Sequence, residues 1–156
     1  NILCNTVQYK QFATKVRCLF QGSFKIDLKR NVVIKDGLMW KRCAEGQIVS
    51  KNNCEGKADQ IYFEDAMGDR KYKRYAGYNN RRVPTIEEIK SILEKRCKKP
   101  AFNLTVFPGS PNFKLWSQTR DENSDDKVWI MFSSTGVAVK HRLSSSAMLR
   151  LVRDVK

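Results

Sequence analysis

The stretch AGYNNRRVPTIEEIKSILEKRC, residues 76–97, decides the fold. Thr85 is followed three residues later by Glu88, and a proline stands just before Thr85, a pattern typical of a capped helix start. Apolar residues then recur at helical spacing, at Ile86, Ile89, Ile92 and Leu93. Pro100 prevents a longer helix. We therefore predict a helix over residues 86–97.

Strand and turn patterns lie on either side of this helix. Residues 25–42 are strand-like and contain Asp36-Gly37, a dipeptide that favours a tight turn between strands. Three more strands are predicted near the end of the chain, at 128–132, 137–139 and 149–152. This mixture of helix and strand predicts an α+β domain.

The remaining segments are an earlier helix and two loops. Apolar residues at helical spacing predict a helix over 62–75 that ends at Gly77. Residues 44–60 and 117–127 are polar and are predicted to be loops. The largest residues of the apolar motifs should fill the core, namely Trp40, Ile89 and Trp116.

The motifs follow one another in an order that resembles the Lcl C-terminal domain family. They are GLMWKRC (37–43), AGYNNRRVPT (76–85), PAFN (100–103), VFP (106–108), LWS (115–117) and LRLVR (149–153). The resemblance implies a compact α+β, C-type-lectin-like domain over 25–156, with two helices and short antiparallel strands, and an extension over 1–24. It also implies export from a bacterial cell. The collagen-like adhesin after whose end domain the family is named binds sulfated glycosaminoglycans. Arg81 here replaces the tryptophan that the family usually has in the AGY motif.

The five cysteines favour disulfides over a metal site, because none of them forms a C-x-x-C pair. Cys43 and Cys54 fall at the two sides of one polar segment, and we predict that they form a disulfide. Cys4–Cys18 is the second bridge that we predict, although Cys97 could pair with either of those two cysteines. Disulfides persist in oxidising compartments, so we expect the protein in the periplasm or on the cell surface.

Catalytic constellations are missing from the sequence. The only histidine, His141, stands between Lys140 and Arg142, and no G-x-S-x-G motif accompanies it. The acidic run at 121–126 begins like a calcium loop, but Asp126 and Phe132 replace the glycine and glutamate that such a loop requires. No run of apolar residues is long enough to span a membrane. We predict a protein that is not an enzyme and has no cofactor or metal.

The net charge of +14 predicts an anionic partner, either an anionic polysaccharide or an acidic protein. The predicted contact residues are two clusters of cations: Lys71, Lys73, Arg74, Arg81 and Arg82, then Lys95, Arg96, Lys98 and Lys99. Such groups bind sulfate and carboxylate. Nucleic acid is not expected as the partner of an exported domain. We therefore predict an adhesin-like protein for sulfated or acidic polysaccharide, or alternatively a periplasmic inhibitor or immunity protein that binds and neutralises a secreted toxin or hydrolase.

Overall fold

A computed structural model describes residues 24–94, 100–109 and 112–155 of the chain. Its strands are β1 (Lys25–Asp27), β2 (Val32–Lys35), β3 (Leu38–Lys41), β4 (Ile48–Ser50), β5 (Asn53–Glu55), β6 (Ile61–Tyr62), β7 (Lys114–Arg120), β8 (Lys127–Phe132), β9 (Val137–Arg142), β10 (Ser146–Ala147) and β11 (Val152–Asp154). Its helices are α3 (Phe63–Gly68), the 3-10 turn η2 (Arg70–Lys73) and α4 (Ile86–Ser91). The predicted α+β class is confirmed.

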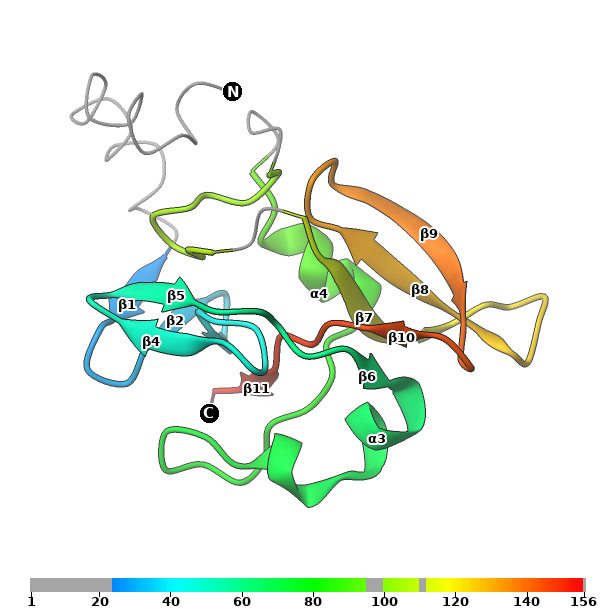
Figure 1. Ribbon diagram of the computed structural model, residues 1–156, viewed down its shortest axis with the longest axis horizontal. Coiled ribbons are helices and arrows are strands. Elements are labelled where there is room, and N and C mark those ends of the chain that lie inside the picture. The colour runs from blue at the N-terminus through cyan, green and yellow to red at the C-terminus, as the bar shows by residue number, and fades with distance from the viewer. Residues whose placement is uncertain (1–23, 95–99, 110–111, 156) are drawn as a thin grey trace.

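Two small antiparallel sheets form the body of the domain (Figure 1). One has the order β1-β2-β3-β11, so the end of the chain pairs with the strand that contains Trp40. The other has the order β7-β8-β9. In Figure 1, β1 to β5 lie on the left, β7 to β9 on the right, and α4 between them, packed against β7 and β8.

The turn and strand predictions near the two ends of the domain are confirmed. Asp36 and Gly37 join β2 to β3 with φ values of 50° and 76°, the conformation that a two-residue hairpin turn requires. β8 and β9 cover the strands predicted at 128–132 and 137–139. The strand predicted at 149–152 is shifted, because Leu149 and Leu151 are buried and pair irregularly, and the regular strand begins at Val152.

The prediction of one helix over residues 62–75 is wrong, because the structure has two separate elements there. α3 ends at Gly68, Asp69 is extended, and the separate turn η2 follows. The Asp69 carboxylate accepts a hydrogen bond from the backbone N–H of Lys71 at 2.9 Å, which caps the new turn and makes the break favourable.

The two predicted polar loops are also partly wrong. Residues 44–60 contain the hairpin β4–β5, which turns at Lys51 and Asn52, both with positive φ. Residues 117–120 belong to β7, so the loop between β7 and β8 is confined to 121–126.

Helix α4 begins as predicted but ends early. It stops at Ser91, and the Glu94 backbone N–H donates to the Ala101 carbonyl at 2.9 Å, which draws the chain out of the helical path. The predicted part of the helix at 95–97 lies outside the described residues.

The core predictions are confirmed. Trp40 and Trp116 are 0% exposed and Ile89 is 1% exposed. Trp40 and Ile89 belong to one cluster of buried residues and Trp116 to a second.

A charged clamp holds the start of α4. Thr85 and Glu88 form the predicted capping box, and both carboxylate oxygens of Glu88 accept hydrogen bonds from Arg82 at 2.7 Å. Burial acts to raise the pKa of Glu88, but the hydrogen bonds from Arg82 and Thr85 outweigh it and leave the pKa below its ordinary value. The carboxylate is therefore more stable as an anion in the folded protein than in the unfolded chain.

Replacing Glu88 with glutamine should lower the free energy of unfolding by about 2 kcal/mol at pH 7, since a charge-assisted pair and part of a cap are lost. Because the folded pKa is depressed, the stability that Glu88 supplies is present above its unfolded pKa and is lost as pH falls through the folded pKa. Urea unfolding at pH 7 and pH 3 should therefore show a smaller difference between wild type and variant at pH 3. An equal difference at both pH values would contradict this role.

Candidate functional site

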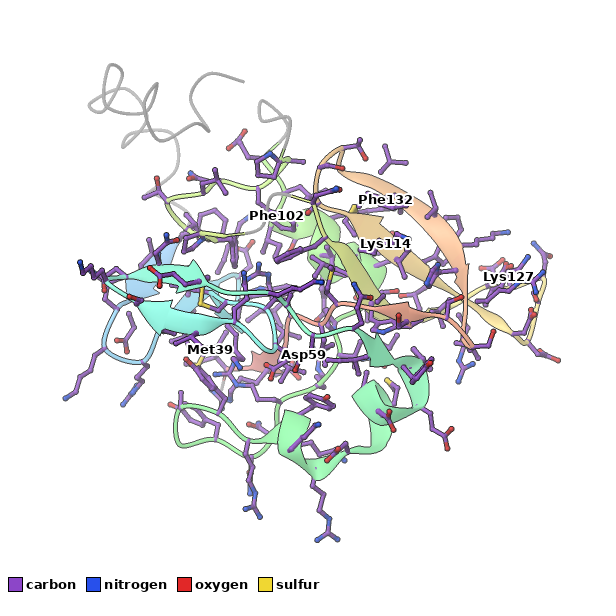
Figure 2. The ribbon with its side chains drawn as sticks, in the orientation of Figure 1. Met39, Asp59, Phe102, Lys114, Lys127 and Phe132 are labelled. Carbon is purple, nitrogen blue, oxygen red and sulfur yellow. A yellow bond between two sulfur atoms is a disulfide. The ribbon has the colours of Figure 1, made fainter. Side chains whose placement is uncertain are left out.

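Four cations surround a short turn after α3, and we call this segment, Arg70–Arg74, the basic turn. Arg70, Lys71, Lys73 and Arg74 are all exposed. Tyr72, between them, is only 6% exposed and belongs to the core cluster that contains Trp116. The Lys73 carbonyl also accepts a hydrogen bond from the Arg81 backbone at 3.0 Å. A buried aromatic residue thus anchors the turn while its charged neighbours point to solvent. Figure 2, in the orientation of Figure 1, shows long side chains that extend from the lower edge of the molecule, below α3.

Acidic neighbours compensate little of this charge. Asp69 lies 3.8 Å from the Lys71 ammonium, and both side chains are largely exposed, so the pair is weak. The pKa of Lys71 is raised, first by its interaction with Tyr72 and then by Asp69, so Lys71 stays protonated. Among the described residues, no ion pair joins Arg70, Lys73 or Arg74 to a carboxylate.

Arg82 does not contribute a free charge to this surface, contrary to the sequence prediction. Its guanidinium pairs with Glu88 at 2.7 Å and with Asp154 at 3.0 Å. These hydrogen bonds, mainly those of Glu88, raise its pKa. Arg82 is therefore part of the clamp that holds α4 against β11.

Arg81 is also not a surface cation, because its side chain is buried and only 2% exposed. Its guanidinium donates to the Met39 carbonyl at 3.0 Å and lies 5.3 Å from the centre of the Tyr75 ring. Burial, and then the nearby charge of Arg153, lowers its pKa to about 10, so it remains a cation at neutral pH. The positive charge that Arg81 adds to the AGY motif is therefore buried, and its guanidinium lies over the Tyr75 ring.

A cavity of about 370 Å³ adjoins the basic turn. It lies between α3 and the extended segment that contains Arg81 and Arg82, and it is lined by Ala66, Met67, Tyr72, Lys73, Asn80, Arg81, Arg82, Val83, Gln118 and Leu151. The structure thus brings together three of the predicted cations, of which Lys73 is the exposed one.

The family model of the Lcl C-terminal domain matches residues 34–153. This chain belongs to the Lcl C-terminal domain family. The members of this family are non-catalytic domains of Lcl-type bacterial proteins. No curated protein matches the chain. The matched residues run from β2 to β11 and include the basic turn and the cavity beside it.

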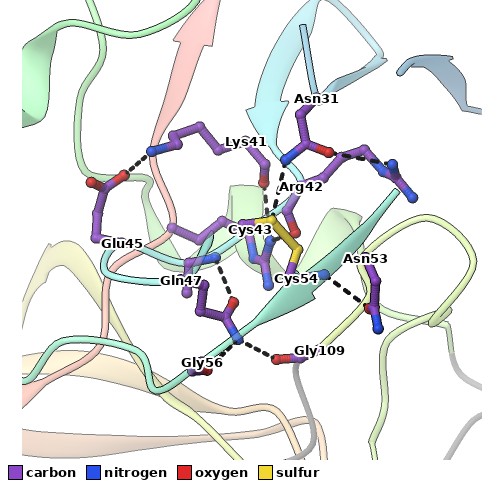
Figure 3. Close-up of a disulfide and its surroundings, with 12 residues drawn as sticks. Asn31, Lys41, Arg42, Cys43, Glu45, Gln47, Asn53, Cys54, Gly56 and Gly109 are labelled. Carbon is purple, nitrogen blue, oxygen red and sulfur yellow. Dashed lines mark hydrogen bonds and ion pairs between the residues drawn. A yellow bond between two sulfur atoms is a disulfide. The ribbon is translucent and has the colours of Figure 1, made fainter. Parts of the chain in front are cut away.

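This Lcl C-terminal domain contains the predicted disulfide between Cys43 and Cys54 (Figure 3). The bridge ties β5 to the segment just after β3, and the Asn31 side chain donates to the Cys43 sulfur at 3.2 Å. Close by, Gln47 donates to the Gly109 carbonyl at 2.9 Å. A Cβ at Gly109 would stand 2.5 Å from the Cys54 carbonyl oxygen, so only glycine allows this close approach.

Seven of the predicted cations and cysteines are not among the residues that the structure describes. Lys95, Arg96, Lys98 and Lys99 lie outside the described residues, as do Cys4, Cys18 and Cys97. The second cluster of cations and the second disulfide therefore stay predictions.

Sequence reasoning missed other cations that the fold gathers near the basic turn. Arg70 belongs to the turn itself. The Lys41 ammonium lies 4.1 Å from the centre of the Tyr75 ring, and the Arg153 guanidinium lies 3.8 Å from that of Tyr78. The sequence does contain a signal for Arg70. The run RKYKR (70–74) holds four cations in five residues, which indicates that Arg70 belongs to the same cluster. Lys41 and Arg153 are distant in sequence and carry no such signal.

The described part of the domain holds no group of three or more His, Cys, Asp or Glu residues placed to bind a metal ion. His141 packs edge-on against Trp116, with ring centres 5.2 Å apart, and its Nε2 pairs with the Ser146 carbonyl. Among the described helices, none is long and apolar enough to cross a bilayer.

Proposed function

We propose that this domain is a binding module whose basic turn engages an anionic partner, and that the partner is a sulfated or acidic polysaccharide. The observation that carries the proposal is the exposure of four cations within five consecutive residues, which form a single weak ion pair, Lys71 with Asp69, among the described residues. A polyanion with repeated charges can contact several of these side chains at once. Guanidinium groups also match the geometry of sulfate and carboxylate oxygens.

The burial of Tyr72 supports this proposal. Because the turn is fixed by a core residue, its four cations are held together before a ligand arrives, and less conformational entropy is lost on binding. The net charge of +14 adds a long-range attraction for anions, which acts over about 10 Å at ~0.1 M salt.

Replacing Arg70, Lys71, Lys73 and Arg74 with glutamine should weaken binding to heparin at least about tenfold at 0.1 M salt, because the densest exposed charge is removed. The wild-type protein should also bind less tightly as salt rises. Affinity measured by calorimetry over a salt series would test both expectations.

The matched control removes the same number of charges elsewhere. Glutamine at four exposed lysines remote in sequence from the turn, Lys25, Lys29, Lys57 and Lys114, changes the net charge equally. This control should bind heparin more tightly than the basic-turn variant does. Equal losses in the two variants would show that net charge alone attracts heparin, which would overturn the site. Salt-insensitive, one-to-one capture of a single acidic protein would favour the inhibitor function instead.

We also propose that the domain is exported to the periplasm or the cell surface. The disulfide between Cys43 and Cys54 supports this location, because such bonds persist in oxidising compartments and are rare in the bacterial cytosol.

A further inference from the structure

We propose that a second cavity beside α3 binds a small carboxylate with an apolar tail, and that Arg120 pairs with the carboxylate. The cavity has a volume of about 540 Å³, within the usual range of about 300–1,000 Å³ for small-molecule sites. It is lined by Phe63, Glu64, Met67, Gly68, Arg120, Leu143 and Ser144. It shares only Met67 with the cavity beside the basic turn.

The apolar part of this cavity comes from two separate segments. Phe63 and Met67 lie one helical turn apart on α3, and Leu143 lies just after β9. Met67 is 41% exposed, so its flexible apolar side chain is accessible to a ligand in this cavity. Gly68 leaves the rim open, since a Cβ built there would meet nothing within 4 Å. These surfaces suit a flat or branched apolar group.

The charged part is Arg120, at the end of β7. Its guanidinium lies 5.0 Å from the centre of the Phe63 ring, a position that presents the cation beside the apolar surface. In the described ranges of the chain, no carboxylate lies within ion-pair distance of this exposed guanidinium. Its hydrogen-bond donors are thus available to an anion, and the guanidinium fork fits a carboxylate with two parallel hydrogen bonds.

The class of ligand follows from this arrangement. An apolar molecule without charge would leave Arg120 unused, and an ion without a tail would leave Phe63, Met67 and Leu143 uncovered. The Glu64 carboxylate, which also lines the cavity, repels multiply charged anions and so favours a ligand with a single negative charge. This site is separate from the basic turn, and its occupancy does not depend on polysaccharide binding.

Nuclear magnetic resonance titration of the full chain with hydrocinnamate would test the site. We expect saturable shifts at the backbone amides of Phe63, Met67 and Leu143. Arg120→Gln should weaken binding about tenfold, because a charge-assisted pair is lost. The matched control Arg142→Gln, which removes an exposed arginine on β9, should bind as wild type does. The basic-turn variant should also retain binding, so that failure of one site is distinguishable from failure of the other.

Two further probes separate the parts of the ligand. Hydrocinnamyl alcohol, which keeps the tail without the charge, and acetate, which keeps the charge without the tail, should both bind at least about tenfold more weakly than hydrocinnamate. Equal binding of the alcohol, equal shifts with acetate, or equal affinities of the Arg120→Gln and wild-type proteins would overturn the proposal. Arg120 is exposed, so Arg120→Gln should fold normally, and its thermal unfolding provides the check.

Discussion

Replacing Trp116 with alanine should lower the free energy of unfolding by about 4 kcal/mol, because a large buried side chain leaves a cavity that its neighbours cannot fill. Trp116 is 0% exposed. It lies on β7 and contacts Phe63 of α3, with ring centres 5.4 Å apart and an edge-on geometry. Its removal should therefore loosen α3 and the basic turn that follows, as well as the sheet itself. Urea unfolding monitored by far-ultraviolet circular dichroism would measure the loss.

Phenylalanine substitutions at the two buried tryptophans provide the matched control. The Trp116 indole N–H donates to the Ile61 carbonyl at 2.7 Å, so Trp116→Phe loses a hydrogen bond and leaves a buried acceptor unpaired, which costs about 1–3 kcal/mol. The Trp40 indole nitrogen has no hydrogen-bond acceptor in the described part of the chain. Trp40→Phe should therefore cost less than Trp116→Phe. The reverse order, or a Trp116→Ala protein as stable as wild type, would contradict this account.

The parts of the fold that could be predicted from sequence are those specified by neighbouring residues. Asp36-Gly37 sets a turn by backbone preference alone, and Thr85 with Glu88 sets a helix start through two local hydrogen bonds. The end of α4 is different. It depends on Ala101, whose carbonyl accepts a hydrogen bond from the Glu94 backbone N–H. The sequence around Ile92 contains no signal that predicts this contact.

The two arginines of the AGY motif show why the site was only partly predictable. In an extended segment, successive side chains point to opposite sides. Arg82 therefore reaches Glu88 and Asp154, while Arg81 reaches Met39 and Tyr75. A sequence shows that two cations are adjacent, but it does not show which distant strand covers each. The number of cations in the sequence therefore overestimates the exposed, unpaired charge at Arg81 and Arg82.

The basic turn was easier to find, since its cations are adjacent in sequence and stay adjacent in space. The single helix predicted over 62–75 would also have placed Arg70, Lys73 and Arg74 on one face, because residues three and four apart are neighbours on a helix. The break at Asp69 and the burial of Tyr72 decide their actual arrangement. The break is favoured by a local hydrogen bond from the Lys71 backbone to Asp69, whereas the burial of Tyr72 is a tertiary effect, because the core determines which residue of the run turns inward.

Removing the disulfide with Cys43→Ser and Cys54→Ala together should lower the free energy of unfolding by about 3 kcal/mol. The two cysteines are 11 residues apart, and closing a loop of this size restricts the unfolded chain by about that amount in the chain-entropy model. Serine at position 43 keeps an acceptor for the Asn31 side chain, and alanine at position 54 fits beside Gly109. The substitutions therefore report mainly the loss of the covalent link.

The hairpin β4–β5 should be the region most affected, since it has little else to hold it. Its strands are three residues each, and Ile48 and Val49 are 71% and 45% exposed, so they bury little apolar surface. Two-stranded hairpins of this kind are marginal in water. Hydrogen exchange should therefore accelerate at β4 and β5 in the variant. Gln47→Ala removes the side-chain hydrogen bonds to Ala44, Gly56 and Gly109 but leaves the disulfide intact, so it is the control and should have a smaller effect.

Reductant separates this bond from any other. If Cys43–Cys54 supplies most of the covalent stabilisation, reduced wild-type protein should unfold at nearly the same urea concentration as the double variant. A further loss when the double variant itself is reduced would reveal a second bridge, as predicted for Cys4 and Cys18. Peptide mapping without reductant gives the direct check, and finding both Cys43 and Cys54 as free thiols would exclude the bond. Because the basic turn is anchored by Tyr72 in a core cluster that contains neither Cys43 nor Cys54, heparin binding by the folded double variant should stay within about twofold of wild type.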